Sequence, residues 1–278
     1  MEKYVTLNNG VKMPRLGFGV YQINDLAQTQ QVVEDGLEVG YRLVDTAQIY
    51  GNEQAVGDAI KHSNVPREDI FVTSKVWVDD YGYDATLKAF DETMKKLQLD
   101  YLDLYLIHKP YNDYYGTWRA MERLYKEGRI RAIGVSSFWN ERLADLITFN
   151  NVKPAVNQIE TNVWNQEWKS QAYMEKEGVQ PEAWAPFAEG AEHIFTNPVL
   201  AEIAQKHGKT TAQVMIRWFL QRNYVVIPKS VHKARLAENF DVFDFEIDAE
   251  DMAKIKTLDQ EHSVLEDEMD PEIAESFR

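Results

Sequence analysis

Residues 102–136 of this 278-residue chain read LDLYLIHKPYNDYYGTWRAMERLYKEGRIRAIGVS. Both ends of this stretch are short apolar runs, and between them Trp118, Met121 and Tyr125 recur at a spacing of about 3.6 residues. An apolar run, an amphipathic helix and a second apolar run are typical of two parallel strands joined by a helix. The stretch therefore predicts an α/β fold built from consecutive βα units.

The same alternation continues on both sides of this unit. The predicted strands are residues 16–19, 42–45, 71–75, 102–108, 130–136, 155–158, 180–184 and 225–227. Apolar stripes with helical spacing lie between them, for example Leu87, Phe90, Met94 and Leu97. Eight strands in roughly 250 residues favour a closed (β/α)8 barrel, the TIM barrel, over an open doubly wound sheet.

Some segments fall outside the repeat. Residues 4–7 and 11–13, joined through Asn8-Asn9-Gly10, predict a β-hairpin with a tight primed turn that could plug the barrel floor. Residues 198–206 and 248–258 predict extra helices, and residues 261–275 form an acidic tail. Because no linker or low-complexity break interrupts the chain, we expect one domain over residues 1–278.

Composition excludes several classes of function. The net charge of -15 argues against nucleic acid or an anionic membrane as a partner, because those partners select clustered Lys and Arg. The chain has no cysteine, which excludes disulfides and thiolate catalysis and fits a reducing compartment. No run of eighteen apolar residues and no signal-peptide pattern is present, so a cytoplasmic protein is expected. Nothing in the sequence requires more than a monomer.

Two glycine motifs are incomplete. Gly17-Phe18-Gly19 lacks the third glycine of a dinucleotide fingerprint at Gln22, and a tight strand exit is the simpler interpretation. Gly208-Lys209-Thr210 resembles the end of a P-loop, but Ile203 stands where the first glycine belongs, so we interpret it as a helix-start turn. The histidines and carboxylates show no metal-ligand spacing, and no metal is expected.

Polar residues end six of the predicted strands or follow them. In a closed barrel the chemistry lies at the C-terminal mouth of the strands, so these side chains should face one cavity. They are Asp45, Lys75, His108, Ser136, Gln158 and Lys229. A single residue of this kind is usually a helix cap or a member of a loop ion pair. Six such residues at the corresponding ends of six strands indicate a catalytic site.

The segment GYRLVDTA at 40–47, followed by YGNE at 50–53, closely resembles the aldo-keto reductase family. The resemblance spans nearly the whole chain and continues through SKVW at 74–77, IH at 107–108, GVS at 134–136, NQIE at 157–160, AWAP at 183–186 and IPKSV at 227–231. The short loops and Trp184 are most similar to the microbial branch of diketogluconate and glyoxal-type reductases. The resemblance implies reduction of aldehydes or ketones.

The resemblance implies four catalytic residues, and their chemistry is consistent. Hydride transfer to a carbonyl carbon leaves negative charge on oxygen, which Tyr50 would protonate. We expect the Lys75 ammonium to lower the pKa of Tyr50 from its usual value of about 10. Asp45 would keep Lys75 charged, and His108 would orient the carbonyl. The alternative is that Asp45 caps a helix, Tyr50 packs, and Lys75 with Asp45 forms only a structural ion pair.

The resemblance also implies NADPH, bound across the barrel mouth without a Rossmann domain. Ser136 and Gln158 would hold the carboxamide, with Ser137 beside them where the family usually has an asparagine, and Trp184 would stack on the nicotinamide. The remaining implied cofactor residues are Ala185, Pro186, Phe187, Lys229, Ser230, Val231, Arg235, Glu238 and Asn239, of which Lys229, Ser230 and Arg235 would bind the adenosine 2'-phosphate.

The substrate, a small carbonyl compound, would contact Tyr21, Trp77, His108 and Lys109. The chain departs from the family at three positions: Ser137 replaces a usual asparagine, Ala185 a common serine, and Lys109 a frequent tryptophan.

Two other functions remain open from the sequence. One is a barrel that binds NADPH without turnover as a regulatory subunit. The other is an aldolase that forms a Schiff base on Lys75, although such lysines usually lack a close carboxylate partner.

Overall fold

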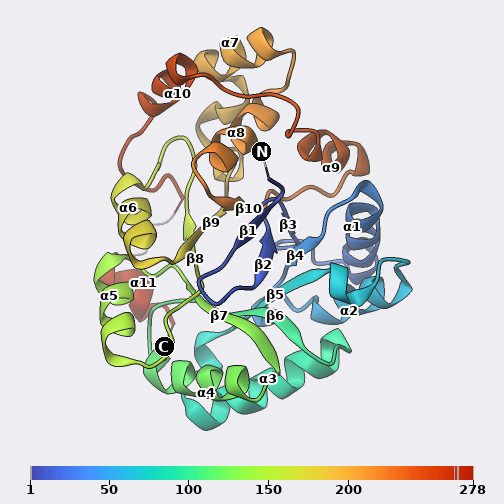
Figure 1. The fold of residues 1–278 in the computed structure, drawn as a ribbon, viewed down its shortest axis with the longest axis vertical. Helices are drawn as coiled ribbons and strands as arrows, with labels where there is room; N and C mark the ends of the chain where they lie inside the picture. Colours follow the sequence, from blue (N-terminus) through green and yellow to red (C-terminus); the bar gives the residue numbers. More distant parts are fainter. Residues whose placement is uncertain (1, 266, 268, 278) are drawn as a thin grey trace.

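The strands form a closed barrel. The computed structural model describes residues 2–265, 267 and 269–277. Within these residues eight parallel strands follow one another in sequence order (Figure 1). They are β3 (Phe18–Gly19), β4 (Leu43–Asp45), β5 (Phe71–Val76), β6 (Leu102–Ile107), β7 (Ile130–Ser136), β8 (Val156–Glu160), β9 (Gln180–Trp184) and β10 (Val225–Val226). A parallel bridge between Leu16 and Val226 joins the two ends of the sheet. The predicted (β/α)8 barrel is confirmed.

The first strand is shorter than predicted because its residues pair on two sides. Phe18 and Gly19 pair with β4, whereas the amide of Gly17 donates to the Val226 carbonyl at 3.0 Å. A β-carbon on Gly17 would collide with the Leu43 side chain, so glycine permits the close approach of these strands. The Gly17-Phe18-Gly19 segment thus serves barrel closure.

Helices surround the barrel (Figure 1). They are α1 (Leu26–Val39), α2 (Glu53–His62), α3 (Tyr83–Leu97), α4 (Tyr114–Lys126), α5 (Asn140–Phe149), α6 (Trp168–Glu177), α7 (Pro198–His207), α8 (Thr211–Gln221), α9 (Lys233–Phe240), α10 (Ala249–Lys256) and α11 (Pro271–Glu275). The turn predicted at Gly208-Lys209-Thr210 is confirmed, because Gly208 ends α7 at φ 64° and Thr210 caps α8 in a capping box with Gln213. No helix among the described residues is long and apolar enough to cross a membrane.

The N-terminal hairpin closes the barrel floor as predicted. Strands β1 (Tyr4–Thr6) and β2 (Lys12–Pro14) pair antiparallel, and Leu7 and Met13 pack into the same buried cluster as the inward residues of the barrel. The predicted primed turn is wrong. Within residues 8–10 only Gly10 has positive φ, at 87°, and its amide donates to the Leu7 carbonyl. This is the pattern of a three-residue loop with a glycine bulge.

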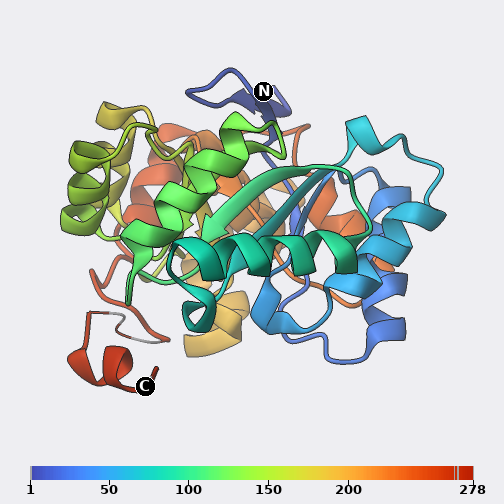
Figure 2. The ribbon, with the colours of Figure 1, turned by 90° about the horizontal axis from the view of Figure 1, so that it is seen from below.

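The C-terminal segment lies at the other end of the barrel from the hairpin (Figure 2). Ser263 Oγ donates to Glu160 Oε2 at 2.5 Å, and the Phe277 ring lies 5.5 Å from the Trp77 ring. Part of the acidic tail is therefore ordered against the strand ends. Two of its residues, Glu266 and Glu268, lie outside the described residues.

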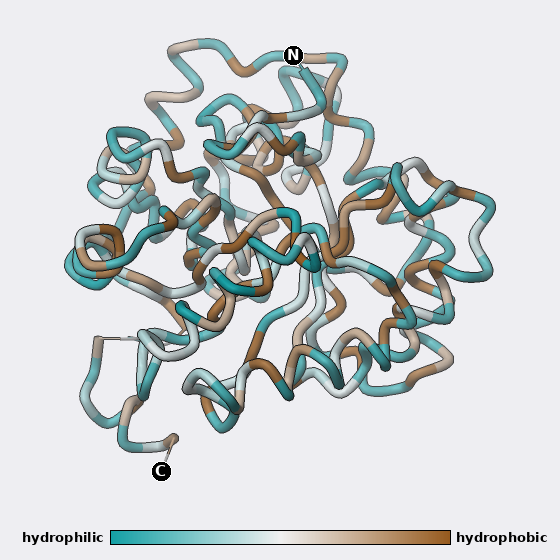
Figure 3. The backbone as a smooth tube through the Cα atoms, turned by 60° about the horizontal axis from the view of Figure 1, so that its bottom comes forward, coloured by the Kyte–Doolittle hydropathy of each residue, from teal (hydrophilic) through white to brown (hydrophobic). Residues whose placement is uncertain are grey.

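The alternation of the strands determines which side chains enter the barrel. Leu43, Phe71 and Leu104 belong to the inner floor cluster, whereas Val44 and Val72 pack with the helices. In Figure 3, hydrophobic segments of the chain, coloured brown, run through the middle of the molecule. Because side chains alternate with a period of two, the residues two and four positions further along each strand also point inward, toward the mouth.

Candidate active site

This alternation brings Asp45 and Lys75 together inside the barrel. Both are buried, and Lys75 Nζ donates to Asp45 Oδ1 at 2.5 Å. The same ammonium donates to the Thr46 carbonyl at 3.1 Å. Asp45 Oδ2 accepts a hydrogen bond from Gln158 Nε2 at 2.9 Å. The ion pair is therefore shielded from water and has hydrogen bonds on more than one side.

Tyr50 reaches this pair from the loop that follows β4. It ends a short 3-10 helix, η1 (Gln48–Tyr50), and Gly51 then turns the chain at φ 69°. Asn52 anchors the turn, because its Oδ1 accepts from Thr46 Oγ1 at 2.7 Å and its Nδ2 donates to the Val20 carbonyl at 2.9 Å. These contacts place the Tyr50 hydroxyl 3.4 Å from Lys75 Nζ.

The expected net lowering of the pKa of Tyr50 is wrong for this structure. Burial raises the pKa of Tyr50 to about 12; Lys75 opposes the rise, and Asp45 adds to it. Loss of water around a phenolate therefore outweighs the attraction of the neighbouring ammonium. The phenol carries its proton throughout the neutral range, as a proton donor must.

Lys75 remains charged although it is fully buried. Burial lowers the pKa of Lys75, but the charge of Asp45, with smaller contributions from Tyr50, from the hydrogen bond to Asp45 and from Glu182, outweighs burial, and the net shift is upward. The site therefore holds a permanent ammonium beside the phenol.

His108 is neutral and lies beside Tyr50. Burial, followed by repulsion from Lys75 and Lys109, lowers the pKa of His108 well below its ordinary value. The imidazole meets the Tyr50 ring edge-on at 5.7 Å and the Trp77 ring at 5.0 Å. Its Nδ1 is buried and has no hydrogen-bond partner among the described residues. A neutral ring in this position can donate one hydrogen bond to a carbonyl oxygen.

The structure adds a carboxyl group that the sequence analysis missed. Glu182 of β9 is fully buried, and its Oε2 accepts from Gln158 Nε2 at 3.1 Å. A signal exists in the sequence, since Gln180, Glu182 and Trp184 alternate on one face of a strand. However, the polar residues at 180–182 weaken the strand pattern, and a buried glutamate in such a strand cannot be told from an exposed one.

The predicted nicotinamide-binding residues occupy the ends of β7, β8 and β9. Ser136 lies in register with Gln158, and the Ser137 amide donates to the Gln158 carbonyl at 2.9 Å. Trp184 ends β9 and is partly exposed. Ser137 and Ala185 both have positive φ, at 62° and 47°. Pro186 and Phe187 then lead into the 3-10 segment η4 (Ala188–Thr196).

The predicted phosphate and adenine residues follow β10. Lys229 is exposed, Ser230 is buried, and Val231 leads into α9, which carries Arg235 and Glu238 on its exposed side and Asn239 on its buried side. Lys229 Nζ donates to Gln22 Oε1 at 3.0 Å, which ties this loop to the loop after β3. Glu238 Oε1 accepts from Thr210 Oγ1 at 3.0 Å.

The predicted substrate residues lie around the catalytic group. The Tyr21 ring is 4.8 Å from the Tyr50 ring, and Trp77 contacts His108. Lys109 Nζ lies 5.8 Å from the centre of the Trp184 ring. Its backbone is fixed by Tyr81, whose hydroxyl bonds both the amide and the carbonyl of Lys109 at 2.9 Å. Lys109 thus extends over the predicted stacking residue.

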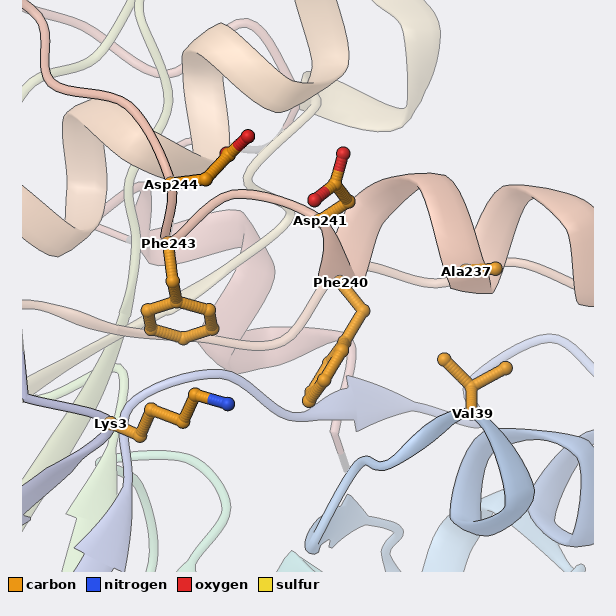
Figure 4. Close-up of a pocket in the computed structure, with 7 residues that line it drawn as sticks. All are labelled: Lys3, Val39, Ala237, Phe240, Asp241, Phe243 and Asp244. Carbon is orange, nitrogen blue, oxygen red and sulfur yellow. The ribbon is translucent and has the colours of Figure 1, made fainter.

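A pocket of about 530 Å³ lies elsewhere, between the N-terminal segment and α9 (Figure 4). Lys3 approaches the rings of Phe240 and Phe243 there, at 5.7 and 5.4 Å. The pocket shares no residue with the site at the strand ends. Among the described residues, no three His, Asp or Glu side chains are grouped as a metal site.

The chain is similar to known proteins over most of its length. Residues 15–260 match the Aldo/keto reductase family. The chain is 48% identical to the glyoxal reductase of Bacillus subtilis (strain 168), over 94% of both chains. An aldo-keto reductase from a Medee basin deep-sea metagenome library superposes with a TM-score of 0.92 at 44% identity, covering 96% of this chain and 98% of that one.

A Bombyx mori aldo-keto reductase in complex with NADP has a TM-score of 0.88 at 33% identity, covering 95% of this chain and 94% of its own. The family match covers most of the length, and these relatives share over 30% identity with this chain, the solved structures among them having the same barrel fold. This chain belongs to the aldo/keto reductase family and is an oxidoreductase.

Proposed function

We propose that this protein reduces aldehydes, ketones and small dicarbonyl compounds to alcohols with NADPH, and that Tyr50 is the proton donor. One observation carries the proposal. The buried Lys75 ammonium lies 2.5 Å from Asp45 Oδ1 and 3.4 Å from the Tyr50 hydroxyl. This is the arrangement that a general acid needs when negative charge develops on a substrate oxygen.

The residues at the mouth fit NADPH. Gln158 Nε2 is already bound by Asp45 and Glu182, which leaves Oε1 to accept from a carboxamide N–H. Lys229, Ser230 and Arg235 offer cationic and hydroxyl donors for a phosphate dianion. NADP is the ligand of one structural relative. When bound, NADPH supplies the hydride.

The proton follows a short path in this proposal. Tyr50 donates its hydroxyl proton to the oxygen that gains negative charge, and the resulting phenolate is stabilised by the Lys75 ammonium. Neutral His108 donates a hydrogen bond to the same oxygen and so fixes its position. Asp45 keeps Lys75 charged through the cycle.

The Schiff-base alternative is disfavoured by charge. An aldolase lysine attacks as the neutral amine, but Asp45 and Tyr50 raise the pKa of Lys75 despite its burial. The regulatory alternative, binding without turnover, has no support in the site, since all four groups needed for turnover are in contact.

We further propose that the preferred substrates are small dicarbonyls and polar keto compounds. Lys109 places a cation over Trp184 where the family often has aromatic surface, and it lies near the mouth. A relative at 48% identity is a glyoxal reductase.

Absorbance of the reduced nicotinamide tests the proposal. Purified protein should oxidise NADPH with glyoxal-type dicarbonyls, aromatic aldehydes and keto acids at measurably different rates. Borohydride treatment with a keto substrate should leave Lys75 unmodified. Carbonyl-independent NADPH oxidation, or covalent trapping on Lys75, would contradict the proposal.

We propose a monomeric, cytoplasmic enzyme. Among the described residues, the exposed large apolar side chains come from separate segments of the chain. They are Tyr4, Tyr21, Leu26, Ile49, Tyr83, Phe149, Phe195 and Met269. Light scattering after gel filtration should give the mass of a single chain, near 32.2 kDa.

A further inference from the structure

The barrel interior holds a carboxyl group that the proposed chemistry does not use. Glu182 is 0% exposed, and its Oε2 accepts from Gln158 Nε2 at 3.1 Å. The same nitrogen donates to Asp45 Oδ2 at 2.9 Å. One amide group is therefore held between two carboxyl groups, one of which pairs with Lys75.

The fold alone does not explain this carboxyl group. Burial of a polar group costs stability unless hydrogen bonds replace water, and Glu182 Oε1 has no partner among the described residues. On the β10 side Glu182 lies in register with Val225, and Leu106 and Ile227 belong to the apolar cluster inside the barrel. An aliphatic side chain would fill the space without that cost. The contact that requires an oxygen here is the one to Gln158.

The carboxyl group also responds to the charges around it. Burial raises the pKa of Glu182 to about 8, repulsion from Asp45 adds to the rise, and Gln158 and Lys75 oppose it. The charged groups that face it are Asp45 from β4 and Lys75 from β5, whereas β8 contributes the neutral Gln158. If Glu182 ionised, the added negative charge would hold the Lys75 proton more firmly and make Tyr50 a weaker acid.

We propose that Glu182 is a positioning residue for carbonyl reduction: with Asp45 it fixes the Gln158 amide so that Oε1 faces the nicotinamide carboxamide, and its own charge tunes Lys75. This inference rests on the proposed function, because the orientation of Gln158 matters to the reaction only when the nicotinamide is bound. Glu182 itself touches neither the substrate nor the reacting atoms in this role.

Two variants separate its two effects. Glu182→Val removes the oxygen that holds Gln158, so NADPH binding followed by fluorescence should weaken by about three- to tenfold. Glu182→Gln keeps an accepting oxygen but cannot ionise. At pH 6.5 it should bind NADPH within about twofold of the wild type, and it should lack the fall in kcat/KM that the wild type shows above about pH 8, on the order of tenfold. Glu122→Gln, a change at a buried glutamate of α4, is the matched control and should match the wild type in both measurements.

Thermal unfolding without cofactor gives a readout independent of turnover. The pKa of Glu182 is about 8 in the folded protein, against 4.5 for a glutamate side chain in water, so the folded protein holds this proton more tightly than the unfolded chain. The stability that it contributes is therefore fully present below about pH 4.5 and is lost as the pH rises through about 8. The unfolding temperature of Glu182→Gln, relative to the wild type, should rise with pH across this window.

Several outcomes would overturn the inference. They are unchanged NADPH affinity and kcat/KM in Glu182→Val, or wild-type pH dependence of both rate and unfolding in Glu182→Gln. If neither variant folds, infrared spectra of the wild type decide, because a protonated carboxyl band should persist at pH 7 and vanish above about pH 8. Absence of that band at pH 7 would count against the inference. Unfolding and infrared spectra report on Glu182 even if reductase activity is absent, so failure of the proposed function would be recognised separately.

Discussion

Tyr50 is the residue on which proton transfer depends in the proposed mechanism. Tyr50→Phe removes only the hydroxyl group, so the rate of carbonyl reduction should fall by about 10² to 10⁴-fold or more, because general acid catalysis and an oxyanion contact are lost together. NADPH affinity should remain, since the predicted stacking and phosphate contacts are elsewhere. Steady-state rates and fluorescence titration measure the two effects.

The matched control is Tyr83→Phe, which removes a hydroxyl from the outer helix α3 and should leave both quantities unchanged. Turnover of Tyr50→Phe near the wild-type rate would show that another group donates the proton.

Lys109 is the residue expected to select the substrate. Lys109→Trp restores aromatic surface beside Trp184 and removes a cation, so kcat/KM should fall for keto acids and rise for aromatic aldehydes. Exposed ion pairs contribute about 0–1 kcal/mol, so a two- to fivefold change in each direction is expected. Lys109→Met, which keeps the stem without the charge, should reproduce only the loss for keto acids. Equal ratios for both substrate classes in all three proteins would show that other loops set the pocket.

At the scale of residues, the sequence was sufficient to predict which side chains meet, but not how they are charged. Asp45, Lys75 and His108 could be placed because they end strands whose C-terminal ends share one mouth. The pKa of Tyr50 could not be predicted, because it depends on how much water the fold removes around the phenol. Glu182 shows the same limit, since the alternation of residues 180–184 does not tell whether its face of the strand is buried against Gln158.

Among the elements, α9 is the one expected to distinguish NADPH from NADH. Arg235 lies on its exposed side, one turn after the loop of Lys229 and Ser230. Arg235→Ala should weaken NADPH binding by about ten- to hundredfold, because a charged hydrogen bond to a phosphate contributes roughly 1.5–3 kcal/mol. NADH affinity should hardly change.

The control for this prediction is Lys233→Ala. It removes a cation from the same helix, but that cation is paired with Asp35 and Glu38 of α1. Equal losses for both cofactors in Arg235→Ala would mean that Arg235 supports the helix and does not bind the phosphate.

The order of the elements was predictable, but some boundaries and one turn were not. Periodicity located every strand, yet β3 is reduced to two residues because Leu16 and Gly17 pair with β10. The Asn8-Asn9-Gly10 turn failed because Asn-Gly also suits a loop in which only the glycine has positive φ. Pairing with β10 across the barrel decides the first feature, and the bond from the Gly10 amide to the Leu7 carbonyl decides the second. The residue pattern alone predicts neither bond.

At the scale of the whole molecule, the strands pair around a closed barrel, so its floor and its mouth belong to one folded unit. The bridge from Leu16 to Val226 joins the first strand to the last. The hairpin covers the floor, at the end of the barrel opposite the C-terminal segment that contacts Trp77. We therefore propose that residues 1–278 fold as one domain. Heat should unfold it in a single transition that tryptophan fluorescence and circular dichroism report at the same temperature.

A substitution at Met13 tests whether the floor contributes to the stability of the whole barrel without contributing to catalysis at the mouth. Its side chain is 0% exposed and packs among the inward residues of the barrel. Met13→Ala should cost about 2–5 kcal/mol and lower the unfolding temperature on the order of 5–15 °C, because it leaves a cavity that the barrel cannot close. The initial rate of carbonyl reduction at 25 °C should stay within about twofold of the wild type, since no predicted site residue belongs to the floor cluster. Met269→Ala, at an exposed methionine of the tail, should change neither quantity. A second unfolding transition in Met13→Ala would contradict the single domain, and a lost rate with unchanged stability would show that the floor positions the catalytic residues.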